Sequence, residues 1–438
     1  MYILLEIKTF VWYIYKSIWR YESMTNLKGA CIIGQSGGPT SVINSSVCGA
    51  VETALKNPSI TRVLGAKNGI EGILNDNIFD FGNEDAREIA LMKTTPAAAL
   101  GSCRYKLKSA GDDETDYKRI LEIFKKYDIR YFFYNGGNDS MDTCNKVSKY
   151  MQSAGYDCNV IGIPKTIDND LAATDHCPGY SSAAKYIATS ISEISLDSKV
   201  YNKGSVIIFE IMGRNAGWLT AAAALASVTG EGADLIYLPE RIFDVKKFVE
   251  DVKRVYEAKK NCIVAVSEGI HDKDGRFISE YGSDISSAKD AFGHSQMGGL
   301  ASTLVDIIKR ETGYKTRGIE FSLLQRAAAH LASKTDVDEA YMSGKTAVES
   351  AVAGATDMMV GFKCERENGY KCEAVLIPLS DVANAEKTVP NEWINAEGNG
   401  ITNVFLDYAL PLIKGESVGE KENGLPRFSR LRKTAITK

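Results

Sequence analysis

The segment ACIIGQSGGPT, residues 30–40, joins a short apolar run to a glycine-rich turn, and the apolar side chains of residues 42–55 then recur at helical spacing. The same order returns at YFFYNGGNDS, residues 131–140, and at VIGIPKT, residues 160–166. A buried strand followed by a turn and a helix is the repeating unit of a parallel sheet. These segments therefore predict an α/β fold whose sheets carry helices on both faces.

A second group of strand patterns follows farther along the chain. Residues 206–211 form the apolar run VIIFEI, which leads through MGR, residues 212–214, into an alanine-rich helical pattern at 219–226. No fixed-period repeat or long linker separates the two groups. We therefore expect two similar three-layer α/β/α domains with mostly parallel sheets, and an active-site cleft between them at the carboxyl ends of the strands.

The length of 438 residues, with 44% hydrophobic and 25% charged side chains, is sufficient for two cores. The patterns predict an N-terminal extension at 1–27, a first domain at 28–175 that is completed by about 326–375, a second domain at 176–325, and a C-terminal segment at 376–438 that packs on the domains.

The charge balance gives a second set of expectations. A formal net charge of -4 offers no general basic surface for nucleic acid or for an acidic membrane, so we expect neither as a partner. The nine cysteines are an odd number with no C-x-x-C pair and no histidine at metal-ligand spacing. Reduced thiols in a cytoplasmic protein are the expected state, and Cys103 and Cys177 are expected to be small buried apolar side chains near the site.

Residues 1–23 are unusual because the aromatic run at 10–15 is flanked by Lys8 and Lys16, too closely for a membrane span. No small-residue cleavage site follows an apolar core, so a secretory signal is not expected. Three interpretations stay open: an amphipathic surface helix, a weak membrane anchor, or sequence upstream of a start at Met24.

Three turns follow three strand patterns, and two of these turns are rich in glycine. Each turn would present backbone N–H groups and a helix N-terminus, which favour an anion such as phosphate. Neither a Walker sequence nor a dinucleotide fingerprint is present. One glycine turn alone is usually an ordinary strand-to-helix connection, so the argument depends on the three together.

The segment PKTIDND, residues 164–170, carries the greatest density of chemical groups. It places an ammonium, a hydroxyl, an amide and two carboxylates directly after an apolar strand. An isolated D-N-D would be a turn capped by its own side chains. Phosphoryl transfer to a hydroxyl, however, needs a carboxylate for the nucleophile, oxygen ligands for magnesium and cations for the migrating charge, and this segment offers all three.

The chain resembles the 6-phosphofructokinases from about residue 28 to residue 342, and it is most similar to their pyrophosphate-dependent members. Seven ordered matches carry the resemblance: SGG at 36–38, LGSCR at 100–104, GGNDS at 136–140, PKTIDND at 164–170, MGR at 212–214, SE at 267–268, and Arg317 with QR at 325–326. Their order and spacing make the resemblance specific, since each motif alone has a structural explanation.

The resemblance implies roles for the matched residues. Asp168 would be the general base for the sugar C1 hydroxyl, Thr166 would contact the acceptor, and Arg104 would reach the transferring phosphoryl group. A magnesium ion is expected on Asp170, Asn138 and Asp139. The first domain would bind the phosphoryl donor through Gly37, Gly38, Asp139, Ser140 and Lys165. The second would bind fructose 6-phosphate, and the substrate contacts would be Thr166, Asp168, Met212, Gly213, Arg214, Glu268, Arg317 and Arg326.

Two positions bear on the donor. Family members that use ATP carry glycine in place of Asp139 and usually a small residue in place of Lys165. A carboxylate about 4 Å from an ATP α-phosphate would cost on the order of 1–4 kcal/mol, whereas Lys165 can pair with pyrophosphate oxygens. We therefore expect pyrophosphate. The alternative is that Asp139 caps a helix and Lys165 turns to solvent, which would leave room for ATP.

The predicted reaction is reversible transfer from pyrophosphate to fructose 6-phosphate, as a step of glycolysis, by a homodimer or homotetramer. An ATP-dependent 6-phosphofructokinase is the alternative, and a subunit that binds sugar phosphate without catalysis is disfavoured because it would need neither Asp168 nor Asp170. The chain departs from the family at Asn138, where pyrophosphate users commonly have aspartate, and at Leu323, where many members have histidine. Cys48 and Glu52 lie where bacterial relatives that use ATP contribute arginines to a nucleotide effector site, so no such effector is expected.

Overall fold

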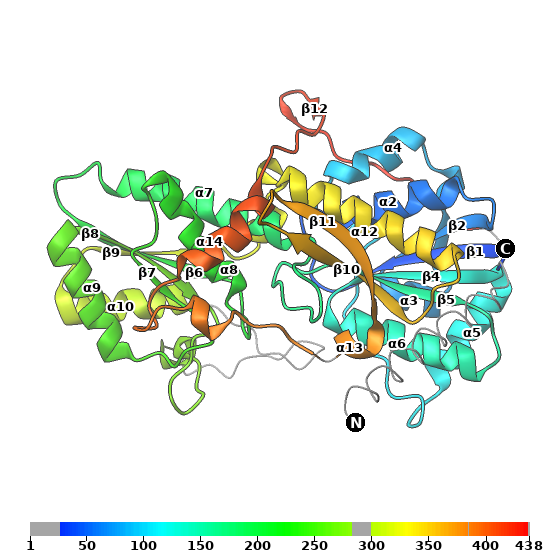
Figure 1. Ribbon diagram of the computed structural model, residues 1–438, viewed down its shortest axis with the longest axis horizontal. Helices are drawn as coiled ribbons and strands as arrows, with labels where there is room; N and C mark the ends of the chain where they lie inside the picture. The colour runs from blue at the N-terminus through cyan, green and yellow to red at the C-terminus, as the bar shows by residue number, and fades with distance from the viewer. Residues whose placement is uncertain (1–26, 283–298, 384, 437–438) are drawn as a thin grey trace.

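The computed structural model describes residues 27–282, 299–383 and 385–436. The three interpretations of residues 1–23 therefore lie outside the described residues. Figure 1 shows two α/β halves side by side along the long axis of the molecule, each with helices on both faces of its own sheet. No helix within the described ranges is long and apolar enough to cross a membrane.

The larger sheet has seven strands in the order β11-β10-β5-β4-β1-β2-β3. Its central strands run parallel, with Ile33 of β1 opposite Phe133 of β4, and Phe133 in turn opposite Ile161 of β5. The strands are β1 (Gly29–Gln35), β2 (Ile60–Ala66), β3 (Ile78–Asp80), β4 (Ile129–Gly136), β5 (Asn159–Pro164), β10 (Met358–Glu365) and β11 (Lys371–Pro378). β3 and β11 are antiparallel to their neighbours and form the two edges.

Alternating side chains build the two layers that cover this sheet. Ile32 and Phe132 belong to the core beneath α3, α5 and α6, whereas Ile33 and Phe133 belong to the core beneath α2 and α12. Successive residues of a strand point to opposite faces, so an apolar run with no polar interruption fills both. The helices of this half are α2 (Ile43–Leu55), α3 (Gly69–Leu74), α4 (Ala86–Leu91), α5 (Thr115–Tyr127), α6 (Asn138–Ser153), α12 (Lys334–Val352) and α13 (Leu379–Val382).

The smaller sheet has four parallel strands in the order β7-β8-β6-β9. These are β6 (Ser205–Ile211), β7 (Leu235–Tyr237), β8 (Asn261–Ser267) and β9 (Thr316–Glu320). Phe209 faces the core that α7 and α14 cover, and Ile208 faces the core under α9 and α10. The helices are α7 (Tyr180–Ser198), α8 (Trp218–Ala221), α9 (Val245–Lys259), α10 (Leu300–Thr312), α11 (Leu324–Ala327) and α14 (Asn403–Ala409).

The alanine-rich pattern at 219–226 is not one continuous α-helix. It begins in α8 and continues as a 3-10 helix, and its small side chains allow close packing against α7. The 3-10 helices are η1 (Phe81–Asn83), η2 (Met92–Thr94), η3 (Ala222–Thr229), η4 (Ile278–Gly282), η5 (Ala329–Leu331), η6 (Asn391–Trp393) and η7 (Leu410–Ile413).

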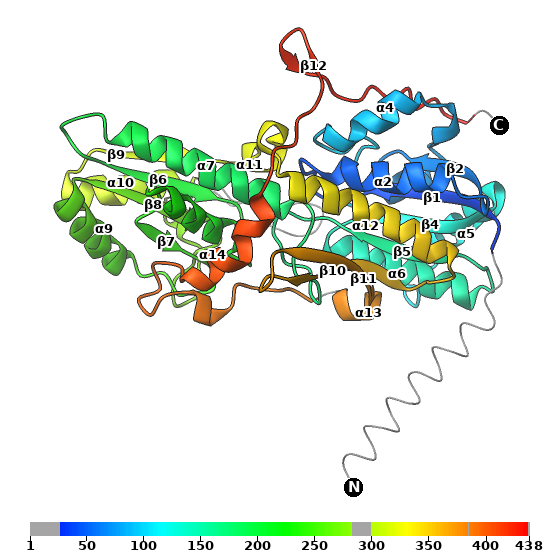
Figure 2. The same ribbon diagram turned by 45° about the horizontal axis from the view of Figure 1, so that its top comes forward.

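The chain crosses between the two halves more than once. After β9 it returns to the larger sheet, where α12 lies against α2 in both views (Figures 1 and 2). It then crosses back, because Phe405 of α14 is buried in the core of the smaller sheet. The last part, with β12 (Lys421–Glu422) and β13 (Leu425–Pro426), runs past α4 and ends beside β3, where the Ile436 N–H donates to the Ile78 carbonyl.

Candidate active site

A cleft of about 710 Å³ opens where the carboxyl ends of strands from both sheets meet. It is lined by residues that follow β1, β4 and β5 of the larger sheet and β6, β8 and β9 of the smaller one. Parallel sheets place their binding sites at this end, because the loops there converge. The lining residues are Ser36, Gly37, Gly38, Pro39, Thr40, Arg104, Gly137, Asn138, Asp139, Ser140, Lys165, Thr166, Ile167, Asp168, Asp170, Met212, Gly213, Arg214, Asn215, Ala216, Glu268, Arg326 and Glu386.

Lys165 is buried at the floor of the cleft, with 4% of its surface exposed. Its ammonium donates a hydrogen bond to the Gly38 carbonyl oxygen over 2.7 Å. A Cβ on Gly37 would lie 3.2 Å from the Lys165 Nζ, and a Cβ on Gly38 would lie 2.9 Å from the Arg326 Nη1. A side chain at either position would displace one of these cationic groups, and the φ of 77° at Gly37 is a conformation that glycine adopts without strain.

The electrostatic state of Lys165 follows from its burial. Desolvation lowers the pKa of Lys165 to about 8, and the nearby carboxylates of Asp168 and Asp170 only partly oppose this shift. The Lys165 ammonium lies inside the cleft. The alternative in which Lys165 turns to solvent and leaves room for ATP is therefore not observed.

Asp168 lies beside Thr166 at the end of the turn after β5. The Thr166 hydroxyl oxygen accepts a hydrogen bond from the Asp168 N–H over 3.0 Å and lies 3.4 Å from the Asp168 Oδ2. Burial raises the pKa of the Asp168 carboxyl above its usual value, while Lys165 acts in the opposite direction. A carboxylate with a raised pKa in a cleft has the character of a general base.

Asn169 fixes the turn that presents the two aspartates. Its φ of 56° is left-handed, which asparagine tolerates better than most residues. Its Oδ1 accepts a hydrogen bond from the Cys177 N–H over 2.9 Å, and its Nδ2 donates to the Tyr408 hydroxyl over 2.8 Å. Asn169 is fully buried, so the middle residue of D-N-D holds the loop and its two neighbours, Asp168 and Asp170, line the cleft.

A pair of side-chain oxygen atoms, from Asn138 and Asp170, is suited to a cation. Asn138 donates a hydrogen bond from Nδ2 to the Asp170 Oδ2 over 3.2 Å. The Oδ1 atoms of both residues are buried and have no hydrogen-bond partner among the described residues. Burial and the neighbouring Asp168 raise the pKa of Asp170 to about 7. A positive ion at this point would satisfy both oxygens and offset the cost of their burial.

Asp139 and Ser140 occupy the first turn of α6. The Asp139 carboxylate lies 3.7 Å from the Lys106 Nζ, and 41% of the Asp139 side chain is exposed. The N-cap of this helix is Gly137, and no side chain caps it. The alternative in which Asp139 caps the helix and leaves room for ATP is therefore not observed. Ser140 is buried and donates a hydrogen bond to the Ser36 hydroxyl over 2.8 Å, which links the start of α6 to the turn after β1.

Residues of the smaller sheet form the opposite wall. The Gly213 N–H donates a hydrogen bond to the Glu268 Oε1 over 3.3 Å, and the Met212 N–H donates to the Gln325 Oε1 over 3.3 Å. Burial raises the pKa of Glu268 to about 7. Arg214 also lines this wall.

Arg326 reaches across the cleft from α11. Its guanidinium lies against Gly38 and close to Arg104 and Asp168, and burial together with Arg104 lowers the pKa of Arg326. Arg326, Arg104 and Lys165 thus concentrate three cationic side chains on one region of the cleft.

Arg317 is the predicted site residue that this chain does not bring to the cleft. It is the second residue of the edge strand β9, opposite Ile207, and it is exposed. The cleft lies at the other end of the strands, so Arg317 does not line it in this chain, and its contact with the sugar phosphate stays a prediction.

Asn215 and Glu386 are among the lining residues that were not predicted from the sequence. Asn215 donates a hydrogen bond to the Glu386 Oε1 over 3.2 Å, which links the loop after β6 to the segment after α13. Glu386 comes from a part of the chain with no motif, so no signal in the sequence singles it out.

The fold and the cleft define a two-domain α/β protein with a cleft between its sheets that contains three cationic side chains. The phosphofructokinase family matches residues 30–331. The pyrophosphate–fructose 6-phosphate 1-phosphotransferase of Methylococcus capsulatus is 45% identical over 408 residues, which cover 92% of this chain and 96% of the relative. The chain belongs to the phosphofructokinase family.

Solved structures agree with this assignment. The pyrophosphate-dependent phosphofructokinase from Marinobacter aquaeolei is 41% identical, with a TM-score of 0.84 over 94% of this chain and 98% of that one. The enzyme of the same description from Nitrosospira multiformis is 40% identical, with a TM-score of 0.85 and the same coverage of both chains.

Proposed function

We propose that this protein transfers a phosphoryl group from pyrophosphate to the C1 hydroxyl of fructose 6-phosphate, giving fructose 1,6-bisphosphate and phosphate in a reversible step of glycolysis. The observation that carries the proposal is the convergence of Asp168, Lys165 and Arg326 on one cleft between the two sheets. The relatives at 40–45% identity are named for this reaction.

Asp168 is the base in the proposed mechanism. It accepts the proton of the C1 hydroxyl while that oxygen forms a bond to the terminal phosphorus of the donor and the bridging P–O bond breaks. Thr166, in contact with Asp168, orients the acceptor. The raised pKa of Asp168 favours proton transfer to it.

Lys165 and Arg104 compensate the charge of the donor, and Gly37, Gly38 and Ser140 form its cradle. Pyrophosphate is the favoured donor because Lys165 is buried inside the cleft and Asp139 adds a carboxylate at its mouth. ATP would have to pass this carboxylate, and a like-charge contact costs on the order of 1–4 kcal/mol.

A divalent cation, Mg²⁺, fits the oxygens of Asn138 and Asp170 that have no partner among the described residues, with Asp139 near them on the cleft wall. When bound, the ion neutralises phosphate charge. Asp170 and Asn138 hold it, and the hydrogen bond between them orients both side chains.

Fructose 6-phosphate is assigned to the wall formed by Met212, Gly213, Arg214 and Glu268. The carboxylate of Glu268 accepts sugar hydroxyl hydrogens, and Arg326 binds a phosphate. We assign Arg317, which is exposed on β9, to a contact with a neighbouring subunit in a homodimer or homotetramer. A cytoplasmic location accords with cysteines that are all free.

Assays of the purified protein with each donor test the proposal. With Mg²⁺ and fructose 6-phosphate present, we expect turnover with pyrophosphate and little or none with ATP. Comparable or faster turnover with ATP would contradict the donor assignment. No turnover with either donor, in a folded protein, would contradict the reaction itself.

A further inference from the structure

Two cysteines face each other across the β10–β11 hairpin. Cys364 and Cys372 are directly opposite in the antiparallel ladder. Opposed residues in such a ladder have Cα atoms about 4.5–5.5 Å apart, which lies within the range of about 4.4–6.8 Å that a disulfide spans. The other seven cysteines are buried, whereas these two are partly exposed to solvent. A soluble oxidant can therefore reach this pair.

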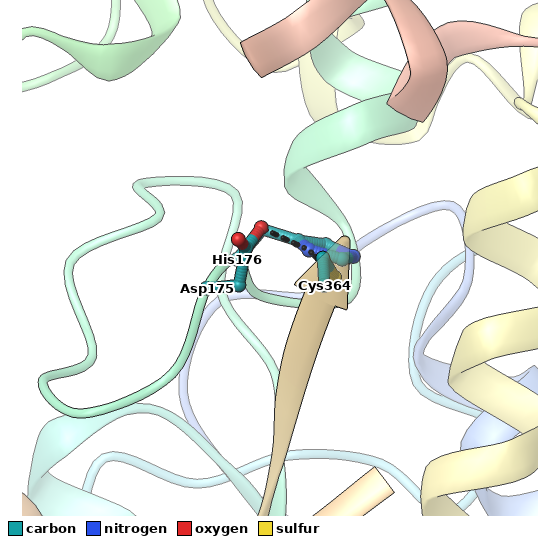
Figure 3. A group of neighbouring side chains, drawn as sticks. All are labelled: Asp175, His176 and Cys364. Carbon is teal, nitrogen blue, oxygen red and sulfur yellow. Dashed lines mark hydrogen bonds and ion pairs between the residues drawn. The ribbon is translucent and has the colours of Figure 1, made fainter. Parts of the chain in front are cut away.

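A buried histidine lies beside one of the two sulfur atoms. The Cys364 Sγ is 3.8 Å from the His176 Nδ1. Figure 3 shows His176 between Asp175 and the end of β10 that carries Cys364. The His176 Nδ1 is 3.0 Å from the Asp175 Oδ1 and its Nε2 is 2.7 Å from the Glu339 Oε2. Since both ring nitrogens face a carboxylate, both carry a proton and the ring is a cation.

The groups around the two thiols shift their pKa values in opposite directions. The neighbouring Cys372 thiol and the positive charge of His176 lower the pKa of Cys364 below its usual value, which favours the thiolate form of its sulfur. The pKa of Cys372 is raised, first by its hydrogen bond to Cys364 and then by burial. The Tyr370 hydroxyl, 3.6 Å from the Cys364 sulfur, faces it from the hairpin turn. One sulfur is therefore a nucleophile and its neighbour keeps a proton.

The same groups do not favour a metal ion. Arg366 engages both Asp175 oxygens, at 2.8 Å and 2.7 Å, and so brings a positive charge to the point where a cation would sit. A protonated imidazole has no lone pair to give. The cluster of Asp175, His176 and Cys364 is therefore better suited to thiol chemistry than to metal binding.

We propose that Cys364 and Cys372 form a redox-active dithiol that a peroxide oxidises to a disulfide. The Cys364 thiolate attacks one oxygen of hydrogen peroxide: an S–O bond forms, the O–O bond breaks, and the leaving hydroxide takes a proton to become water. The Cys372 thiol then gives up its proton as its sulfur attacks Cys364. The S–S bond forms, the S–O bond breaks, and a second water leaves. Two thiols lose two electrons in total and peroxide gains them.

The experiment uses the full-length folded protein. It is exposed to hydrogen peroxide at neutral pH, the remaining thiols are alkylated, and the peptides are analysed by mass spectrometry. We expect a peptide pair joined through Cys364 and Cys372, two hydrogen atoms lighter than the reduced pair, and its loss on treatment with dithiothreitol. The proposal is overturned if both thiols stay fully alkylatable after peroxide treatment.

Three variants sharpen the test. C372S removes the resolving thiol, so a sulfenic acid should accumulate on Cys364 and react with dimedone. C364S should slow the oxidation of the protein at least about 10-fold, because the thiolate is lost. Cys158→Ser removes a buried thiol that immediately precedes β5; it is the matched control and should oxidise as the parent does. Equal oxidation rates for C364S and the control would refute the dithiol.

Discussion

Asn138 donates a hydrogen bond from its side-chain amide to the carboxylate of Asp170 over 3.2 Å, and each residue keeps a buried oxygen without a partner in the described part of the chain. The pair thus has one acceptor-only oxygen on each side, an arrangement that is costly to bury without a cation. The Asn138 side chain is neutral, so the pair carries at most the single negative charge of Asp170.

Asn138→Asp should strengthen magnesium binding and weaken the magnesium-free protein. Two facing carboxylates repel one another unless a cation lies between them, so the melting temperature without Mg²⁺ should fall. The Mg²⁺ concentration for half-maximal activity should fall by about 10-fold, because a charged ligand replaces a neutral one. Thermal denaturation with and without Mg²⁺, together with a Mg²⁺ titration of activity, measures both effects. A rise in the required Mg²⁺ would count against this site.

Asp168→Asn should lower kcat by roughly 10²- to 10⁴-fold, since the amide cannot accept the proton of the sugar hydroxyl. The KM values should change far less, and circular dichroism should show an intact fold. Asp381→Asn, at an exposed position of α13, is the matched control and should leave kcat unchanged. Equal turnover in the Asp168 variant and the parent would remove the assigned base.

The sequence was sufficient to predict the parallel strands and most of the cleft. Runs such as residues 131–134 are apolar without alternation because both sheet faces are covered, and residues after such strands converge at one edge. Asp168, Lys165 and Glu268 were located by that argument together with the family motifs.

The other features of the site could not be predicted, because they depend on tertiary contacts that no local sequence pattern encodes. Arg317 lies near the start of β9, and a motif match does not say at which end of a strand a side chain lies. Glu386 reaches the cleft because the chain crosses back after α13, and Tyr408 holds Asn169 from 239 residues away. These pairings arise from tertiary packing of a segment without recognisable motifs.

Lys165→Met should raise the KM for pyrophosphate and reduce kcat together, by roughly 10²-fold in kcat/KM, because the ammonium that pairs with donor oxygens is lost. Its hydrogen bond to the Gly38 carbonyl is also lost. Lys106→Met removes a more exposed ammonium near Asp139 and should have a much smaller effect. Steady-state kinetics with varied pyrophosphate distinguishes them. Similar losses in both variants would indicate a general charge effect and not a specific donor contact.

Glu268→Gln should make the ligand-free protein more stable at alkaline pH. Burial raises the pKa of Glu268 to about 7 from the usual 4.5, so its contribution to stability is complete below about pH 4.5 and is lost as the pH rises through 7. The variant has no charge to desolvate. Its free energy of unfolding should exceed that of the parent by on the order of 1–3 kcal/mol at pH 8 and should match it near pH 4.5. Urea denaturation at the two pH values measures the difference, and a pH-independent difference would contradict the raised pKa.

Arg326→Gln and Arg317→Gln separate the two arginines that the family motifs place on the sugar phosphate. Arg326 lies against Gly38 and beside Arg104, so its loss should raise the KM for pyrophosphate as well as that for fructose 6-phosphate, each by about 10-fold or more. Arg317 is exposed and outside the cleft, so its loss should leave the KM for pyrophosphate unchanged. A higher KM for fructose 6-phosphate alone in the Arg317 variant, together with an oligomer in analytical ultracentrifugation, would support a contact supplied to a neighbouring subunit. An increased KM for pyrophosphate in that variant would contradict the placement of β9, because no side chain at that end of the strand could reach the donor in its own chain.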